Sequence, residues 1–162
     1  MKKSIFLVYV LLAFALPACT GAKKTATGNG IKSLELSRGA CFGKCPVYSI
    51  KIFDNGLVRY TGKGFVKFEG VYEKKFSAEE VQKLLNEAAA YRIDTCQTEY
   101  PYVPDLPGVD YTITYKNRTQ KIHNAHRGPA FLTELASDID NHILVDGSWK
   151  KIADKETDPR KP

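Results

Sequence analysis

Four cysteines are the residues of this chain best suited to chemistry, and their settings differ. Cys19 follows an apolar stretch near the N-terminus, Cys41 and Cys45 are separated by three residues, and Cys96 stands alone. A cysteine can form a disulfide, bind a metal, act as a nucleophile or carry a lipid anchor. Each of these roles needs a different neighbourhood, so the residues around each thiol decide between them.

The run CFGKC, from Cys41 to Cys45, predicts a small loop closed by a disulfide. A loop of about five residues would contribute about 2 kcal/mol in the chain-entropy description. Pairing of either cysteine with Cys96 would close a longer loop and contribute about 4 kcal/mol. The sequence leaves the pairing among Cys41, Cys45 and Cys96 open. We favour Cys41–Cys45 because their closeness needs no assumption about the fold.

Catalytic and metal-binding roles for these thiols are weaker interpretations. Redox dithiols usually have two intervening residues at a helix start, whereas Cys41 and Cys45 have three and precede a predicted strand. A zinc site would add His123 and His126, but the chain lacks a second closely spaced cysteine pair. A thiol nucleophile would need one of these histidines as its base. We expect no metal or other cofactor and no catalytic residue, with a thiol-dependent envelope enzyme using Cys41 or Cys45 as the alternative.

A proline-rich loop from Tyr100 to Gly108 is the candidate interaction site. It carries Tyr100, Tyr102, Asp105 and Leu106. Tyrosine combines an apolar ring with a polar tip, which suits a partner surface. The same tyrosines would also suit a core position with the hydroxyl reaching water.

Two carboxylates flank this loop. Asp105 and Asp110 could do acid–base work as a pair. One lies in the predicted loop and the other on the outward side of a predicted strand, however, and such positions are typical of turn and surface residues.

The N-terminal residues predict a signal peptide of the lipoprotein type. Lys2 and Lys3 precede an uncharged stretch, Ile5 to Leu16, whose helical length of roughly 18 Å is too short for a bilayer core of about 30 Å. The run LPAC, from Leu16 to Cys19, resembles the lipobox of bacterial lipoproteins. That resemblance implies cleavage before Cys19 and lipid on its thiol, and several acyl chains give lasting attachment. An ordinary secretory signal is the alternative.

The expected location follows from the residues after Cys19. Thr20 stands where aspartate retains some Gram-negative lipoproteins in the inner membrane, and no acidic cluster follows. We therefore expect the periplasmic face of the outer membrane. The partners expected are the membrane, through the lipid on Cys19, and an unidentified envelope protein or ligand.

Composition bounds the remaining classes. The chain has 162 residues with 43% hydrophobic residues, which is typical of one globular domain. The 24 Lys and Arg residues exceed the 18 Asp and Glu residues by 6, and by 4 once Lys2 and Lys3 are removed (22 − 18). The cations are scattered, so we expect no nucleic-acid binding. We expect a signal peptide at 1–18, a lipidated cysteine and flexible tether at 19–30, one domain at 31–150, and a disordered tail at 151–162.

Periodicity predicts the elements of this domain. Alternating apolar residues predict strands at 33–37, 48–52, 57–61, 65–76, 109–116 and 119–124. Helical spacing predicts a helix over 78–91, after a Ser-x-x-Glu capping box, and another from Gly128-Pro129 to Asp146-Gly147.

The turns between these elements follow from glycine. Asn55-Gly56 predicts a tight hairpin turn with positive φ at both residues. Residues 62–64 are expected to turn the chain again, and Gly70 to mark a bulge. The order β-β-β-β-α-β-β-α predicts a two-layer α+β fold, with a mostly antiparallel sheet and the helices on one face.

The segment from Leu34 to Gly62 resembles the start of an uncharacterised bacterial family, domain of unknown function 6438. Its pattern Cys-x-Gly-x-Cys-Pro-x-Tyr is matched by Cys41, Gly43, Cys45, Pro46 and Tyr48, and its Asp-x-Pro loop by Asp105-Leu106-Pro107. The resemblance covers about residues 33–150. It implies an envelope or secreted setting and no known activity. Cys96 lies outside the pattern, which favours a partly buried free thiol.

Together these observations predict a lipid-anchored envelope protein with a small, non-catalytic binding domain. The sequence names neither its partner nor its ligand.

Overall fold

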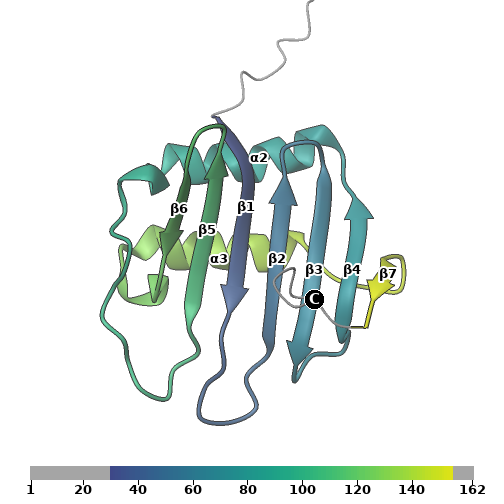
Figure 1. Ribbon diagram of the computed structural model, residues 1–162, viewed down its shortest axis with the longest axis horizontal. Helices are drawn as coiled ribbons and strands as arrows, with labels where there is room; N and C mark the ends of the chain where they lie inside the picture. The colour runs from purple at the N-terminus through teal and green to yellow at the C-terminus, as the bar shows by residue number, and fades with distance from the viewer. Residues whose placement is uncertain (1–29, 155–162) are drawn as a thin grey trace, which may run out of the picture.

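The computed structural model describes residues 30–154, so the predicted signal peptide and Cys19 lie outside the described residues. Seven strands form one sheet in the order β6-β5-β1-β2-β3-β4-β7, with every neighbouring pair antiparallel (Figure 1). The strands are β1 (Ile31–Arg38), β2 (Val47–Phe53), β3 (Leu57–Gly64), β4 (Gly70–Lys75), β5 (Val109–Tyr115), β6 (Thr119–Ile122) and β7 (Lys150–Ala153). The predicted α+β class and the antiparallel sheet are confirmed.

Alternation along β1 explains how the sheet separates core from surface. Leu34 and Leu36 are fully buried, whereas Glu35 between them is half-buried and lies beside Lys51 of β2 at 3.3 Å. Successive side chains of a strand point to opposite faces. One face of β1 therefore packs into the core and the other carries polar side chains.

Two helices complete the core, α2 (Ala78–Ala90) and α3 (Ala130–His142). Figure 1 shows both passing behind the sheet, α2 near one end of the strands and α3 lower down. Ser77 and Glu80 form the predicted capping box at the start of α2. Apolar residues at helical spacing in both helices are buried: Val81, Leu84, Leu85, Ala88, Leu132, Leu135, Ala136 and Ile139. Short 3-10 helices, η1 (Ile93–Thr95) and η2 (Ala125–Arg127), lie in the connections.

The hairpin between β3 and β4 differs from the prediction. Residues 62–64 were expected to turn the chain, but they continue β3, and the turn lies at residues 65–69. Close approach of the turn explains why residue 62 is a glycine, because a Cβ on Gly62 would lie 2.0 Å from the carbonyl oxygen of Phe68. Gly70, expected as a bulge within one long strand, is the first residue of β4, with φ +109°.

The β2–β3 turn also differs in detail. Of Asn55 and Gly56, only Gly56 has positive φ, at +89°. The amide of Gly56 donates to the carbonyl of Phe53 at 3.0 Å, and the Asn55 side chain accepts from the amide of Leu57 at 2.9 Å. A single residue with positive φ at the end of the turn is typical of a three-residue hairpin loop rather than a two-residue one.

The C-terminal boundaries need two corrections. The last helix was expected to run to Asp146-Gly147, but α3 ends at His142, and Leu144 lies outside it. The expected boundary at residue 150 falls inside β7, so 151–153 belong to the sheet rather than to a tail. Asp154 is the last described residue, and the remainder of the predicted tail lies outside the described range.

The strand directions give the domain two distinct ends. The chain enters β1 at Gly30, at the top of Figure 1, and we name this side the Gly30 end. The connections 39–46 and 65–69 lie at the opposite side, together with the part of the connection 96–108 that leads into β5, and we name this side the loop end (Figure 1). No helix within residues 30–154 is long and apolar enough to cross a membrane.

Candidate functional site

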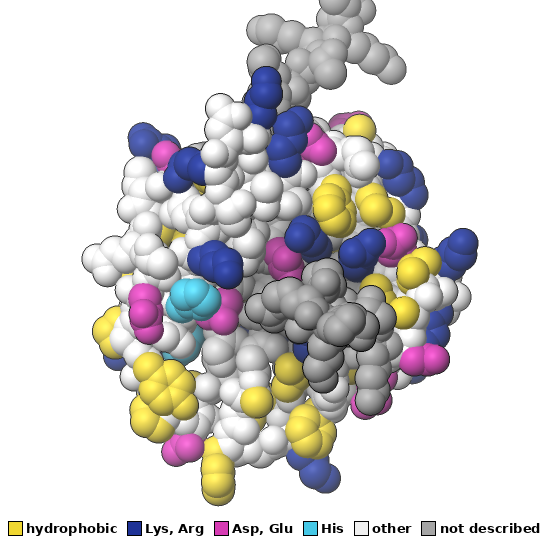
Figure 2. Space-filling model, in the orientation of Figure 1, with side chains coloured by type: hydrophobic (Ala, Val, Ile, Leu, Met, Phe, Trp, Pro, Cys, Tyr) yellow, Lys and Arg dark blue, Asp and Glu magenta, His cyan; other side chains and the backbone are white. Residues whose placement is uncertain are grey.

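The loop end carries most of the large apolar side chains that are exposed in the described part of the chain. They are Phe42 (89% exposed), Phe65 (59%), Tyr102 (71%) and Leu106 (47%). In Figure 2 hydrophobic side chains lie along the lower edge of the molecule, where Figure 1 places these loops. Burying such side chains against a partner is favourable, because it removes apolar area from water. The loop end is therefore the candidate interaction site.

The disulfide loop presents the most exposed of these side chains. Cys41 and Cys45 are bonded to each other, with their Cα atoms 5.7 Å apart, which is the pairing that the sequence favoured. Gly43 has φ +147°, and its amide donates to the carbonyl of Cys41 at 2.9 Å. This tight loop directs Phe42 outward.

A backbone contact joins the disulfide loop to the proline-rich loop. The amide of Gly39 donates to the carbonyl of Gly108 at 2.8 Å. A Cβ on Gly39 would lie 3.3 Å from the backbone of Gly108, which is tighter than ordinary contact. Glycine at position 39 therefore lets the two predicted site segments lie side by side.

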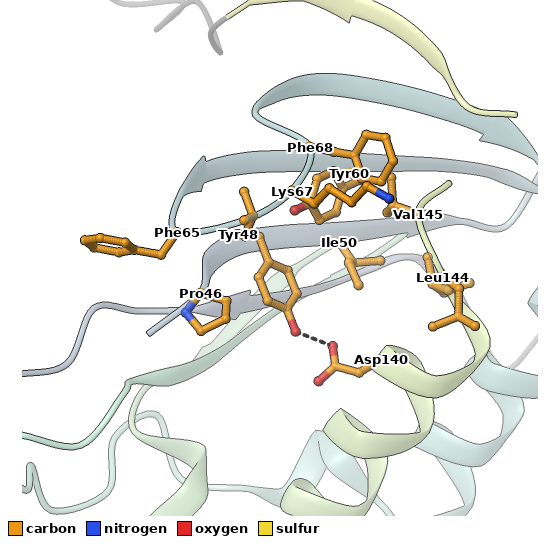
Figure 3. Close-up of a pocket in the computed structure, with 12 residues that line it drawn as sticks. Pro46, Tyr48, Ile50, Tyr60, Phe65, Lys67, Phe68, Asp140, Leu144 and Val145 are labelled. Carbon is orange, nitrogen blue, oxygen red and sulfur yellow. Dashed lines mark hydrogen bonds between the residues drawn. The ribbon is translucent and has the colours of Figure 1, made fainter. Parts of the chain in front are cut away.

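Asp140 of α3 contacts residues on both sides of the disulfide loop. Asp140 accepts a hydrogen bond from Arg38 at 2.5 Å. It accepts another from the hydroxyl of Tyr48 at 2.7 Å (Figure 3). Burial, followed by the bond to Asp140, raises the pKa of Tyr48 to about 12. Burial acts to lower the pKa of Arg38, but the hydrogen bond and charge of Asp140 outweigh it and the pKa is raised. The tyrosine therefore stays neutral, and the arginine charged, at physiological pH.

The proline-rich loop contains an exposed, projecting turn. Pro104 and Asp105 form its centre, and Asp105 has φ +68°. Proline followed by a residue with positive φ is the arrangement of a type II turn. Tyr102 and Leu106 flank the turn and are exposed.

Tyr100 differs, because its ring is half-buried and lies where a Cβ on Gly128 would meet it at 2.8 Å. Tyr100 therefore supports the loop from within, whereas the other three predicted residues reach solvent.

A groove of about 340 Å³ opens beside the disulfide loop, on the helix side of β2 and β3. Figure 3 shows Tyr48, Ile50 and Tyr60 projecting into it from the strands, with Leu144 and Val145 on the chain that leaves α3. Its lining is Pro46, Tyr48, Ile50, Tyr60, Phe65, Val66, Lys67, Phe68, Asp140, Ile143, Leu144 and Val145. The groove exists because α3 ends at His142 and leaves this part of the core face without a helix.

An aromatic row forms the floor of the groove and continues beyond it. The rings of Tyr48 and Tyr60 lie 5.7 Å apart, and those of Tyr60 and Tyr72 lie 6.4 Å apart. Burial, followed by the nearby Tyr72, raises the pKa of Tyr60 to about 12. Rings at such separations pack favourably. The floor of the groove therefore consists of packed, uncharged aromatic rings.

The remaining sequence candidates do not assemble into a catalytic set. His123 lies 3.6 Å from Asp110, whose carboxylate also accepts from the amide of Asn124 at 3.0 Å. Asp105 lies apart from this pair, on the projecting turn. Both ring nitrogens of His126 are buried without a hydrogen-bond partner in the described structure.

The thiols do not complete a metal or nucleophile site either. Cys41 and Cys45 are consumed in the disulfide, so neither is available beside His123 or His126. Cys96 is a half-buried free thiol, as expected, and burial raises its pKa. Residues 30–154 contain no cluster of three or more His, Cys, Asp or Glu side chains that could hold a metal ion.

Sequence reasoning missed two parts of the site. Asp140 lies between Ile139 and Ile143 of the helical stripe, and nothing local marks its contact with Arg38, 102 residues away. Phe42 lies next to Gly43 in the short loop between Cys41 and Cys45. An apolar residue in such a short loop was a usable signal for an exposed loop tip.

Comparison with models of protein families gave a match for this chain. Residues 32–143 match the family described as Domain of unknown function (DUF6438). They include both loops, β1 without Ile31, β2 to β6, and helices α2 and α3. The chain belongs to this family. The search of curated proteins gave no match. The DUF6438 match spans the Arg38–Asp140 contact and stops before β7, so β7 adds a strand outside the matched region.

Proposed function

We propose that the chain is a lipid-anchored lipoprotein of the cell envelope, attached through Cys19 at the periplasmic face of the outer membrane. Its two-layer domain, with α2 and α3 on one face of the sheet, binds a partner without catalysis of its own. The arrangement of the two ends carries this proposal. The chain from Cys19 joins the domain at Gly30, whereas the exposed apolar side chains gather at the loop end (Figure 1).

The opposite positions of the attached end and the exposed apolar side chains support a binding role. A domain held at its Gly30 end presents Phe42, Tyr102 and Leu106 away from the membrane. Aromatic anchors contribute most when a partner covers them fully. The disulfide and the prolines stiffen the segments that carry them, and stiff segments lose less entropy on binding. Both loops therefore suit recognition of a macromolecule.

Lipid attachment is tested in cells with labelled palmitate. Wild-type protein is expected to take up the label and to lose residues 1–18, and a Cys19→Ser variant is expected to take up none. An unlabelled, uncut wild-type product would overturn the anchor.

Binding is tested by cross-linking the full-length protein in intact cells and purifying it through a tag. Leu106→Ala is expected to reduce cross-linked partner about tenfold, which corresponds to roughly 1.4 kcal/mol. Ile152→Ala is the matched control, because Leu106 and Ile152 are both 47% exposed but Ile152 lies on β7. Equal yields from the wild type and both variants would contradict a binding role for the loop end.

The thiol-enzyme alternative makes an opposite prediction for the disulfide loop. We expect Cys41–Cys45 to be fully oxidised in the purified mature protein and to resist mild reduction, as a structural disulfide would. Mass spectrometry after alkylation measures this directly. A readily alkylated thiolate at either position would favour the enzyme.

A further inference from the structure

The groove beside the disulfide loop and the projecting turn of the proline-rich loop both carry exposed apolar side chains, and their unpaired charges have opposite signs. We propose that the groove of one molecule receives the Tyr102–Leu106 turn of a second copy of this chain. The inference rests on the proposed binding role of the loop end, and it names the partner as another copy.

The groove is built to accept an apolar group from outside. Ile50, Tyr60 and Ile143 line it and are themselves nearly buried, so its floor belongs to the core. Phe65 and Leu144 stand at its margin and are 59% and 67% exposed. Phe65 also has φ +54°, an uncommon conformation for a bulky side chain. Exposed apolar margins around a buried apolar floor favour an apolar occupant.

The projecting turn supplies such a group on a segment that contains a proline. Tyr102 and Leu106 are 71% and 47% exposed on either side of the turn centred on Pro104 and Asp105. Proline fixes φ and reduces the entropy lost when the loop becomes ordered against a partner. The turn therefore offers two apolar side chains with an acidic residue between them.

The charges of the two surfaces match. Lys67 lines the groove, is exposed, and contacts only the ring of Phe68, at 5.4 Å, among the interactions of the described chain. Asp105 is exposed and has no ion-pair partner in residues 30–154. The carboxylate that lines the groove, Asp140, is already paired with Arg38. The free charge of the groove is thus positive, and that of the turn is negative.

The fold places the turn and the groove so that each of two copies can bind its turn in the groove of the other. The turn precedes β5, and the groove lies over β2 and β3, so β1 stands between them in the sheet. A two-fold axis between molecules pairs each turn with the other groove, which makes a closed dimer with two equal contacts. Both surfaces lie toward the loop end, and anchoring of both copies in one membrane raises their effective concentration. A weak contact is therefore sufficient.

Charge reversal tests the proposal on full-length protein. Two differently tagged copies are expressed together, and the amount of the second copy that co-purifies with the first is measured. Lys67→Glu in both copies, or Asp105→Lys in both, is expected to reduce co-purification about tenfold. Combining Lys67→Glu with Asp105→Lys in each chain is expected to restore it, because the pair is again complementary.

The controls separate this pairing from general effects of charge and folding. Lys116→Glu changes an exposed lysine in the β5–β6 turn at the Gly30 end and is expected to leave co-purification unchanged. Thermal unfolding of each variant checks that the domain is folded. Single variants that still pair, or a double variant that does not recover, would overturn the second-copy proposal. If Leu106→Ala still reduces capture of a different protein in that case, the binding role of the loop end stands without self-pairing.

Discussion

The hydroxyl of Tyr48 donates a 2.7 Å hydrogen bond to Asp140, and this contact ties the strand after the disulfide loop to helix α3. Arg38, which precedes the same loop, holds the other carboxylate oxygen at 2.5 Å. One side chain of α3 therefore holds both ends of the loop that presents Phe42, and at the same time lines the groove.

Removal of this carboxylate should destabilise the domain. Asp140→Ala leaves the Arg38 guanidinium and the Tyr48 hydroxyl without their partner, at sites where Arg38 and Asp140 are only 21% and 26% exposed. We expect the free energy of unfolding to fall by about 2 kcal/mol, between the values for exposed and fully buried pairs. Urea unfolding measures it. Asp94→Ala, which breaks the more exposed Arg92–Asp94 pair, should cost less than about 0.5 kcal/mol, and equal losses would contradict this role of Asp140.

Alkaline pH should weaken the fold through tyrosines whose pKa is raised by burial, and Tyr48 and Tyr60 are two of these. Burial is the main cause that raises the pKa of both Tyr48 and Tyr60 to about 12, from an ordinary value of 10.0. A group whose pKa is higher in the folded than in the unfolded protein contributes its full stabilisation when the pH is below the unfolded pKa. That stabilisation is lost as the pH rises through the folded pKa. The free energy of unfolding should therefore fall between pH 10 and pH 12.

A double variant isolates this effect from the titration of lysines. Tyr48→Phe with Tyr60→Phe should lose less stability over the same pH window than the wild type, as measured by urea unfolding at successive pH values. Tyr102→Phe removes a tyrosine from an exposed position and should follow the wild type. A double variant that falls as steeply as the wild type would show that other groups dominate.

Helices α2 and α3 place two carboxylates close together, Glu87 of α2 and Asp138 of α3, and substitution of one removes their repulsion. Burial raises the pKa of Glu87, and the hydrogen bond and charge of Asp138 raise it further. Because the folded pKa is raised, the protonated form is favoured in the fold and stability is lost as pH rises through it. Glu87→Gln should therefore raise the free energy of unfolding at neutral pH by about 0.5 kcal/mol, with no gain in acid. Thermal unfolding checks this.

Glu79 provides the matched control for that change. It lies in the first turn of α2, where a negative charge favours the helix. Glu79→Gln should lower stability by a few tenths of a kcal/mol, the opposite sign for the same chemical substitution. A stabilising effect at both positions would point to a general benefit of lower charge instead.

Gly70 should resist substitution at the junction of β4 and β7. Its φ is +109°, and a Cβ would lie 2.6 Å from the carbonyl oxygen of Ala153. Gly70→Ala should lower the free energy of unfolding by about 2 kcal/mol, because backbone strain adds to the clash. At Gly147 a Cβ meets nothing within 4 Å, so Gly147→Ala should change stability little. Equal effects in urea unfolding would contradict the close approach.

Local patterns predicted the elements that depend on local physics. The capping box at Ser77 and the alternation of Leu34 and Leu36 each reflect one segment and its immediate neighbours, and both are confirmed. The Cys41–Cys45 pairing was favoured for the same reason, since four positions separate the two residues.

Features that depend on distant segments were not predictable. β7 carries mostly exposed side chains and forms because β4 offers it a strand edge, so its own sequence holds little signal. The apolar run Ile143-Leu144-Val145 continues the helical pattern, and only the folded chain reveals that it leaves α3 and forms one side of the groove. For the same reason, the role of Asp140 becomes visible only once Arg38 is in place.

The central position of β1 has a mechanical consequence. The chain enters the domain at Gly30 through a strand that is hydrogen-bonded along its length to β2 on one side and to β5 on the other. A pull applied through the preceding residues runs parallel to this strand and loads both ladders in shear, so that many bonds share the force at once. The same pull along an edge strand such as β6 would load only its single ladder with β5, so fewer bonds would share the force. The sheet is thus arranged to withstand tension from its N-terminal side.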